Sequence, residues 1–170
     1  MTGGWYKFLL VCHILAAIFG FGAVVLNGIY GAESKKRQGA EGLAITEANH
    51  RVSNVGEYFI YAVPIFGILM VLASHHVWKF SQTWVSAALA LYVIALGVSH
   101  GVMFPAVKRI ERLTRELIEM GPPPAGSAPA GPPPQVAELA ALDKRLAIGG
   151  GFLNIMLVAI VVLMVWKPGV

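Results

Sequence analysis

The sequence predicts an all-α protein, a four-helix transmembrane bundle that runs up and down through a membrane. Of its 170 residues, 56% are apolar and only 13% are Asp, Glu, Lys or Arg, whereas a soluble domain carries about 25% charged residues. The mean hydropathy is +0.67, and four long runs carry no charge, at 8–32, 58–78, 80–107 and 146–166. This composition excludes a disordered chain and argues against a water-soluble enzyme. A single cysteine, Cys12, excludes a disulfide scaffold.

Each uncharged run is long enough to cross a membrane as a helix. A crossing of about 30 Å of hydrocarbon needs about 20 apolar residues, and the backbone must satisfy its own hydrogen bonds in lipid. The chain 1–170 is therefore expected to be a single integral membrane domain, with spans at about 6–31, 55–77, 82–107 and 146–166. The first span is interpreted as a retained helix. No basic segment precedes it and no cleavage site of small residues follows it, as a signal peptide requires.

The distribution of basic residues predicts the orientation, because cytoplasmic loops are enriched in Lys and Arg. The loops after the first and third spans hold ten of the 13 basic residues, and the opposite side holds only Lys7, Lys79 and Lys167. We therefore expect a multi-pass protein of a bacterial plasma (inner) membrane, with the N-terminus and the C-terminus outside. The sequence pI of about 9.4 reflects this asymmetry, so no nucleic-acid partner is indicated. Aromatic residues mark the outer boundary as a belt: Trp5, Tyr6, Trp78, Trp84 and Trp166.

A short helical extension is predicted on the cytoplasmic side. Apolar residues between 108 and 120 repeat at helical spacing beyond Pro105, and Gly121 then ends this helix. The segment 121–135 contains seven of the ten prolines and is predicted to be an extended Pro/Gly-rich linker. A helix resumes at 136–145 and runs into the fourth span.

Small and polar residues at helical spacing predict which faces point into the bundle, since membrane helices pack through such residues. In the first span they are His13, Ala16, Ala17, Gly20, Ala23 and Asn27. In the second they are Glu57, Tyr61, Pro64, Ile68 and Val71. In the third they are Ser86, Ala90, Gly97, His100 and Gly101, and in the fourth Ala147, Gly150, Gly151 and Asn154.

Four of these residues are expected near the membrane midplane, counted at about 1.5 Å per residue from the span ends: His13, Pro64, His100 and Asn154. Pro64 also leaves the carbonyl of Ile60 without its usual donor. Polar groups at this depth cost free energy and suggest a function. The structural alternative is a hydrogen bond across helices, worth about 0.6 kcal/mol, and both interpretations stay open.

Two imidazoles on diagonal helices can hold a haem between them. We therefore predict a site for haem b, or for a related metal or quinone group, with His13 and His100 as the axial metal ligands. Asn154 and the Ile60 carbonyl would orient the imidazoles. The predicted role is one-electron transfer or haem handling. His75 or His76, at the outer end of the second span, is the alternative partner of His13.

Two polar residues lie at the inner end of the second span, His50 and Glu57. Local capping and charge pairing is the favoured interpretation, and entry of a proton or a quinone is the alternative.

The alternative function is that of an accessory or scaffold subunit without a cofactor. No hydrolytic or phosphate-binding motif is present, so no catalytic residue is assigned and an enzyme is not indicated. The small-residue faces would then pack against a membrane protein complex or a second copy of the chain, within the lipid bilayer.

Two segments resemble a family of small bacterial integral membrane proteins of unknown function. They are WYKFLLVCHILAAIFGFGA at 5–23 and DKRLAIGGGFLN at 143–154, and the resemblance extends over nearly the whole chain. The first helix is also similar to copper-resistance protein D and to the haem-binding J-type protoporphyrinogen oxidase, in which a histidine precedes a glycine by about ten residues. His13 and Gly22 match this pair. Leu10 and the segment 24–27 stand where the oxidase has basic residues, so the similarity implies haem binding and not the oxidase reaction.

Overall fold

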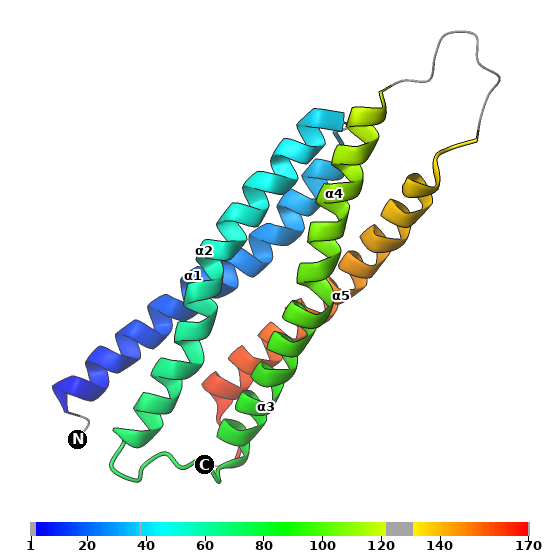
Figure 1. The fold of residues 1–170 in the computed structure, drawn as a ribbon. Coiled ribbons are helices and arrows are strands. Elements are labelled where there is room, and N and C mark those ends of the chain that lie inside the picture. The colour runs from blue at the N-terminus through cyan, green and yellow to red at the C-terminus, as the bar shows by residue number, and fades with distance from the viewer. Residues whose placement is uncertain (1–2, 38, 122–130, 170) are drawn as a thin grey trace.

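The protein is all-helical in the computed structural model, which describes residues 3–37, 39–121 and 131–169 (Figure 1). The helices are α1 (Gly4–Lys35), α2 (Gly39–Leu72), α3 (Thr83–Val98), the π-helical turn η1 (Ser99–Met103), α4 (Phe104–Met120) and α5 (Pro134–Trp166). The segments α3, η1 and α4 follow one another without a break. Within the described ranges, four continuous helices are long and apolar enough to span a membrane. The predicted fold class is confirmed.

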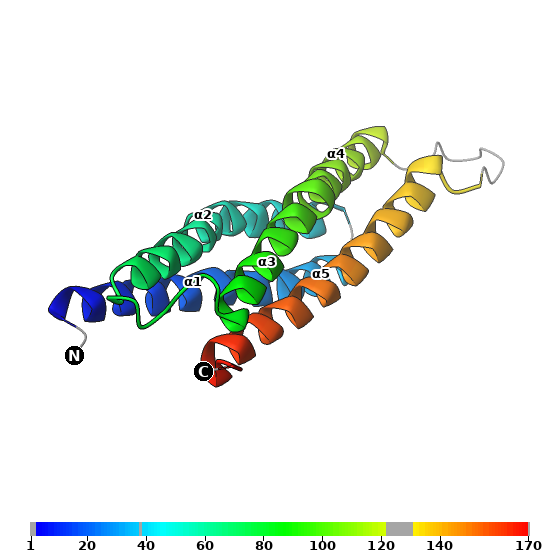
Figure 2. The same cartoon turned by 90° about the horizontal axis from the view of Figure 1, so that it is seen from below.

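The four long helices alternate in direction and form two hairpins. The first hairpin joins α1 to α2, and the second joins α3 to α5 (Figures 1 and 2). Contacts of α2 with α4 and of α1 with α5 connect the hairpins, so α1 and α3 lie on a diagonal. Both termini and the α2–α3 loop lie at one end of the bundle, here called the aromatic end. The α1–α2 turn and the facing ends of α4 and α5 lie at the other, here called the charged end (Figure 1).

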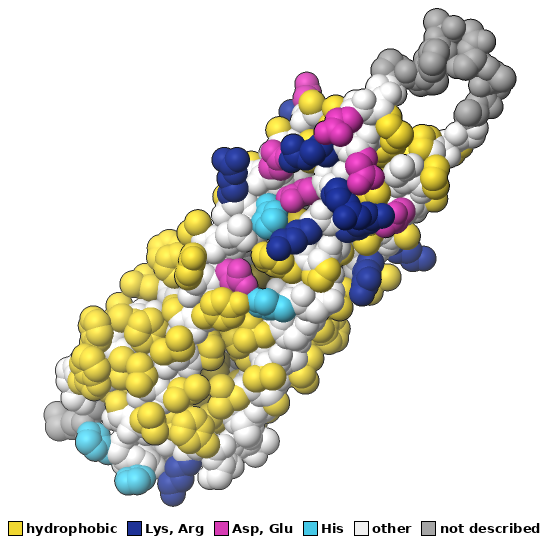
Figure 3. Space-filling model, in the orientation of Figure 1, with side chains coloured by type: hydrophobic (Ala, Val, Ile, Leu, Met, Phe, Trp, Pro, Cys, Tyr) yellow, Lys and Arg dark blue, Asp and Glu magenta, His cyan; other side chains and the backbone are white. Residues whose placement is uncertain are grey.

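One buried layer joins all four long helices. Its members are Ala16 of α1, Val63 of α2, Tyr92 of α3 and Ile160 of α5. Most other large apolar side chains lie exposed on the outside of the bundle. Such a surface is expected where lipid replaces water. Figure 3 shows apolar side chains over the half of the bundle toward the termini and charged side chains gathered over the other half.

The α1–α2 hairpin packs closely because glycines lie between its helices. A Cβ atom placed at Gly20 would lie 3.1 Å from the backbone nitrogen of Ile60, and one at Gly56 would lie 2.5 Å from Cβ of Ala23. Small residues allow membrane helices this approach. The first span therefore faces inward as predicted, and its Asn27 accepts a hydrogen bond from the Ser53 hydroxyl at 2.8 Å.

The predicted inward faces of the third and fourth spans are wrong. Their small residues are exposed, namely Ser86, Ala90, Gly97 and Gly101 on α3 and η1, and Ala147, Gly151 and Asn154 on α5. The buried positions are instead Trp84, Val85, Ala88 and Tyr92 on α3, and Gly149, Met156 and Ile160 on α5. Large side chains, above all Tyr92 and Trp84, fill the interior on this side. The expectation that small residues mark the packed face therefore fails here.

An aromatic cluster closes the aromatic end. The Trp78 indole donates a hydrogen bond to the Tyr6 hydroxyl at 2.9 Å and meets Trp84 edge to face at 5.4 Å. The Lys167 ammonium lies 4.2 Å from the centre of the Trp78 ring. Trp84 is only 6% exposed, so this member of the predicted belt belongs to the bundle interior.

Ion pairs join the helices at the charged end. Lys35 of α1 pairs with Asp143 of α5 at 3.3 Å, and Arg109 of α4 binds both carboxylate oxygens of Glu138 at 2.6 and 2.8 Å. The Arg109 guanidinium lowers the pKa of the Glu138 carboxyl, because it stabilises the charged form. Of the predicted linker 121–135, residues 122–130 lie outside the described residues, and α5 already begins at Pro134.

Candidate functional site

His13 lies half-buried on α1 and is bound to α2. Its Nδ1–H donates a hydrogen bond to the carbonyl oxygen of Val63 at 2.9 Å. The ring fits beside Gly67, where an added Cβ would lie 3.2 Å from the His13 Cε1 atom. In the neutral ring this bond fixes the tautomer with the proton on Nδ1, so Nε2 keeps its lone pair.

The carbonyl of Ile60, which Pro64 deprives of its helical donor, has another partner. The Tyr92 hydroxyl donates to it at 2.7 Å, and Tyr92 is only 7% exposed. An unpaired carbonyl in the membrane would cost several kcal/mol, so this contact explains the buried tyrosine. The Ile60 carbonyl thus orients no imidazole in this arrangement. The sequence analysis did not single out Tyr92. A proline inside a span leaves a carbonyl without its helical donor, so a hydroxyl on a neighbouring helix is the signal that could have identified this residue.

His100 belongs to a compact cluster with two residues of α2. Its Nδ1–H donates to the Leu96 carbonyl at 3.0 Å. Its Nε2 lies 2.7 Å from Oε1 of Glu57 and 2.6 Å from the Tyr61 hydroxyl. Tyr61 in turn donates to the same Glu57 oxygen at 2.7 Å. We call Glu57, Tyr61 and His100 the boundary cluster.

The π-helical turn η1 carries His100 (Ser99–Met103). A π-helical turn is rare and often accompanies a functional site. Here it lies in the α3–α4 helix at the level where that helix meets Glu57 and Tyr61 of α2.

The short contact between Glu57 and His100 depends on which of their atoms carries a proton. Since the Nδ1 proton is engaged with Leu96, Nε2 has a lone pair unless a second proton binds there. A bare carboxylate oxygen 2.7 Å from that lone pair would be repelled. The contact is attractive when one proton resides either on Nε2 or on Glu57. Tyr61 adds a second donor to the carboxylate.

A second histidine–carboxylate pair continues the polar contacts between α2 and α4. His50 Nδ1 lies 2.7 Å from Oε1 of Glu111. The Phe104 ring separates the two histidines, edge to face with His50 at 5.5 Å and parallel to His100 at 6.2 Å. The sequence interpretation of His50 as a charge-paired residue agrees with this contact. Further out, Arg115 pairs with Glu47, so three polar contacts follow one another between α2 and the η1–α4 segment.

His13 and His100 have different hydrogen-bond partners on α2. His13 is bound to the Val63 carbonyl, which comes six residues after Glu57 and two residues after Tyr61, the two partners of His100. Both ring nitrogens of His100 are engaged in hydrogen bonds. His100 would have to release one of these partners to bind an iron, and the haem site stays a prediction.

His100 also lies nearer to the charged end than expected. Its expected midplane depth was counted from Lys108. The structure instead places His100 beside Glu57, where the uncharged run of α2 begins. The uncharged run of the third span, 80–107, exceeds the length that a crossing needs, so its inner end extends past this boundary.

The other predicted site residues lie apart from these two. Asn154 is exposed on α5 and forms no hydrogen bond with a described residue. His75 and His76 are exposed in the loop after α2, with φ angles of 51° and 69°. Among the described residues, no group of three or more His, Cys, Asp or Glu side chains could hold a metal ion.

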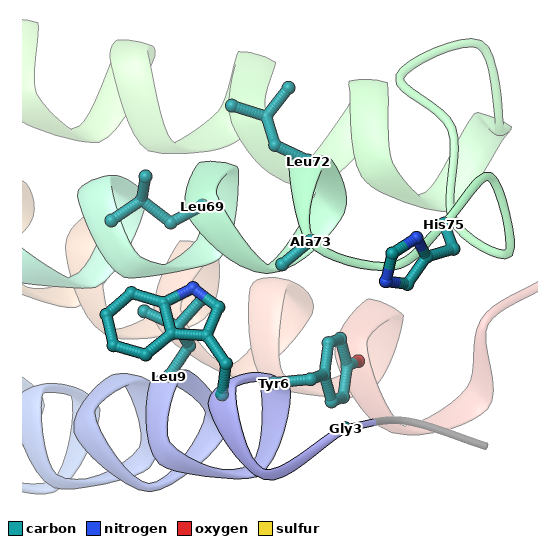
Figure 4. A pocket seen from close by; sticks show the side chains of 8 residues that line it. Gly3, Tyr6, Leu9, Leu69, Leu72, Ala73 and His75 are labelled. Carbon is teal, nitrogen blue, oxygen red and sulfur yellow. The ribbon is translucent and has the colours of Figure 1, made fainter.

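A shallow pocket of about 380 Å³ lies at the aromatic end between the start of α1 and the end of α2 (Figure 4). Its lining is mainly apolar and includes Leu9 of α1 and Leu69 of α2, while Tyr6 and His75 lie toward the ends of the two helices (Figure 4). The Tyr6 hydroxyl already accepts the hydrogen bond from Trp78. The pocket contains neither His13 nor His100. The boundary cluster is therefore the best-formed polar site within the span region that the structure describes.

Comparison with known proteins agrees with this architecture. Residues 7–168 match the family described as Predicted integral membrane protein (DUF2269). No curated protein and no solved structure matches the chain, so the similarity of α1 to copper-resistance protein D and to the oxidase stays an expectation. The matched region covers nearly all of the four long helices and the segments between them. The chain therefore belongs to this family of integral membrane proteins.

Proposed function

We propose that this membrane protein binds a proton in the boundary cluster, and that the bound proton strengthens the contact between α2 and the η1–α4 segment. The observation that carries the proposal is the 2.7 Å contact between His100 Nε2 and Glu57 Oε1, which is attractive only when a proton lies between them. A histidine is the side chain best suited to exchange a proton near neutral pH.

The position of the cluster gives the proton a structural consequence. The two hairpins meet through only a few element pairs, chiefly α2 with α4 and α1 with α5. Two of the polar contacts between α2 and the η1–α4 segment contain a histidine, His100 with Glu57 and His50 with Glu111. Loss of a proton from either histidine removes the charge attraction in that contact. The separation of the hairpins at the charged end would therefore respond to pH.

We further propose that the charged end faces the cytoplasm of a bacterial cell. The support is the excess of basic residues at this end, ten against three, which the positive-inside rule associates with cytoplasmic loops. The side chains of Glu57 and His100 are 26% and 44% exposed, so the cluster is open to the boundary region. The protein would then respond to cytoplasmic pH.

A second candidate function, an accessory subunit of a membrane complex, has one observation in its favour. Ala147, Gly151 and Asn154 lie on the exposed side of α5. A polar amide facing lipid is unfavourable, and a partner helix could satisfy it. Purification in a mild detergent tests this candidate. A stoichiometric partner that is lost with Asn154→Leu would support it, and a wild-type chain that purifies alone would oppose it.

The pH dependence of thermal stability in detergent tests the proton-binding function. We expect the wild-type protein to be less stable once the pH is high enough to remove the shared proton, because the Glu57 carboxylate then faces the lone pair of His100 Nε2. Glu57→Gln should remove most of this dependence, since the glutamine amide can donate to the Nε2 lone pair without a bound proton. The control is Glu41→Gln, a carboxylate that is exposed and forms no ion pair with a described residue. Equal pH dependence in Glu57→Gln and wild type would refute the proposal.

A further inference from the structure

We infer that a pocket between η1 and α5 at the charged end binds one anionic phospholipid. The pocket measures about 490 Å³ and is lined by Val102, Ala141, Lys144, Arg145, Ile148, Gly149 and Phe152. This inference does not depend on the proton-binding cluster, because no residue of that cluster lines the pocket.

The lining combines an apolar groove with two cations. Ile148 and Phe152 are 65% and 44% exposed and lie one turn apart on α5, so together they offer a surface to an acyl chain. Lys144 and Arg145 come directly before the uncharged run that begins at Leu146. The cations therefore lie at the level of lipid headgroups and the apolar residues at the level of acyl chains. A phospholipid would place its charged headgroup at the cations and its acyl chain along the apolar residues.

The local packing of η1 against α5 forms one wall of the pocket. Gly149 is buried against Met103, whose Sδ atom lies 2.5 Å from the position of an added Cβ. A side chain at position 149 would therefore displace the Met103 side chain from its place against α5. Val102, the neighbour of Met103, faces the pocket from the η1 side.

The two cations differ from most basic residues of the charged end in their partners. Six others form ion pairs with carboxylates: Lys35, Lys36, Arg37, Arg109, Arg112 and Arg115. Lys144 and Arg145 form no ion pair with a residue that the structure describes. Two acidic residues of the same helix segment are already engaged, Asp143 with Lys35 and Glu138 with Arg109. A phosphate supplied by a lipid would neutralise this local positive charge.

The same charges argue against a second copy of the chain as the occupant. In a twofold dimer through this surface, the cations of the two copies would face each other and repel. Basic pockets between membrane helices at the cytoplasmic side commonly bind anionic headgroups. An anionic phospholipid thus satisfies both the groove and the cations.

Native mass spectrometry of the full chain in neutral detergent tests this inference. Phosphatidylglycerol and phosphatidylcholine with the same acyl chains are added in parallel, and the lipid-bound fractions give the affinities. We expect tighter binding of phosphatidylglycerol to wild type. The double variant Lys144→Gln/Arg145→Gln should weaken it roughly thirtyfold, from about a fivefold contribution per cation. The matched control is Lys36→Gln/Arg37→Gln, an adjacent ion-paired set that should change it less than about twofold.

A second variant separates loss of the pocket from loss of charge or of folding. Ala141→Phe fills the pocket from an exposed position of α5 and keeps both cations, so it should also weaken phosphatidylglycerol binding. Inorganic phosphate alone should not compete, because the groove contributes to affinity. The inference is overturned if the two lipids bind equally, if the control weakens binding as much as the double variant, if phosphate displaces the lipid, or if Ala141→Phe binds like wild type. A second protein chain bound in place of the lipid would also overturn it.

Discussion

Substitution of Gly56 by alanine should destabilise the α1–α2 hairpin by an amount that follows from the structure. The added methyl group would lie 2.5 Å from Cβ of Ala23, whereas carbon atoms in contact prefer about 3.5–4.0 Å. No rotamer change relieves this contact, because both atoms are fixed to helix backbones. The two helices must therefore separate by about 1 Å. Overpacking of this kind costs about 1–3 kcal/mol, and alanine returns about 0.5–1 kcal/mol through helix propensity. The two terms leave a net loss of about 0–2.5 kcal/mol, with about 1 kcal/mol as its centre.

Thermal unfolding in detergent measures this loss against two matched variants. Gly22→Ala adds the same methyl group on α1, where no atom lies within 4 Å, and should leave stability unchanged or slightly raised. The double variant Ala23→Gly/Gly56→Ala moves the methyl group from one helix to the other and should recover most of the lost stability. The reasoning is refuted if Gly56→Ala is as stable as Gly22→Ala, or if removal of the Ala23 methyl group brings no recovery.

Three further predictions concern the interior, the topology and the cofactor. Tyr92→Phe leaves the carbonyl that Pro64 deprives of its donor without a partner, so it should cost about 1–3 kcal/mol in thermal stability. The cost should shrink in a Pro64→Ala background, where the helical N–H returns, and an equal cost in both backgrounds would contradict the assignment. With the charged end in the cytoplasm, a cysteine at position 125 (Ala125→Cys) should react with an impermeant maleimide only after the cells are opened, and labelling of intact cells would reverse the topology. The haem site predicted from the sequence is tested by the visible spectrum of protein purified after growth with ample haem: a low-spin spectrum lost in His13→Ala and in His100→Ala would support the site, and a wild-type protein without any haem spectrum would contradict it.

The sequence predicts the helices well because the membrane imposes simple rules on them. Uncharged runs of sufficient length must be helical in lipid, and charged residues mark their ends. The inward face of α1 also follows from its pattern, since Gly20 and Ala23 contact Ile60 and Gly56 directly. The helix bounds depend on the residues of one helix alone, and the inward face of α1 depends only on its packing against α2.

The faces of α3 and α5 could not be predicted in the same way. Small residues allow close packing but do not require it, and here Trp84 and Tyr92 face the interior. Tyr92 faces inward and donates a hydrogen bond to the Ile60 carbonyl on α2. The residue pattern of α3 alone does not show that a carbonyl on α2 lacks a donor.

The contacts within the boundary cluster could not be predicted from the sequence either. The sequence predicts that Glu57, Tyr61 and His100 all face the bundle, whereas Tyr61 and His100 are exposed in the structure. Which of them meet depends on how far α2 and the α3–α4 helix are shifted along each other, and that shift is a property of the whole fold. The expected depth of His100 depends on a count from Lys108, whereas its contact with Glu57 places His100 level with the start of the uncharged run of α2.

The shared proton of the boundary cluster is tested most directly by nitrogen NMR of the five histidines in detergent, across pH. His100→Gln identifies the resonances of His100 by their loss. In wild type, we predict that the Nε2 resonance of His100 reports the shared proton, and that this resonance differs in Glu57→Gln. An identical Nε2 resonance of His100 in wild type and in Glu57→Gln would contradict the account, because the carboxylate would then hold no part of the proton.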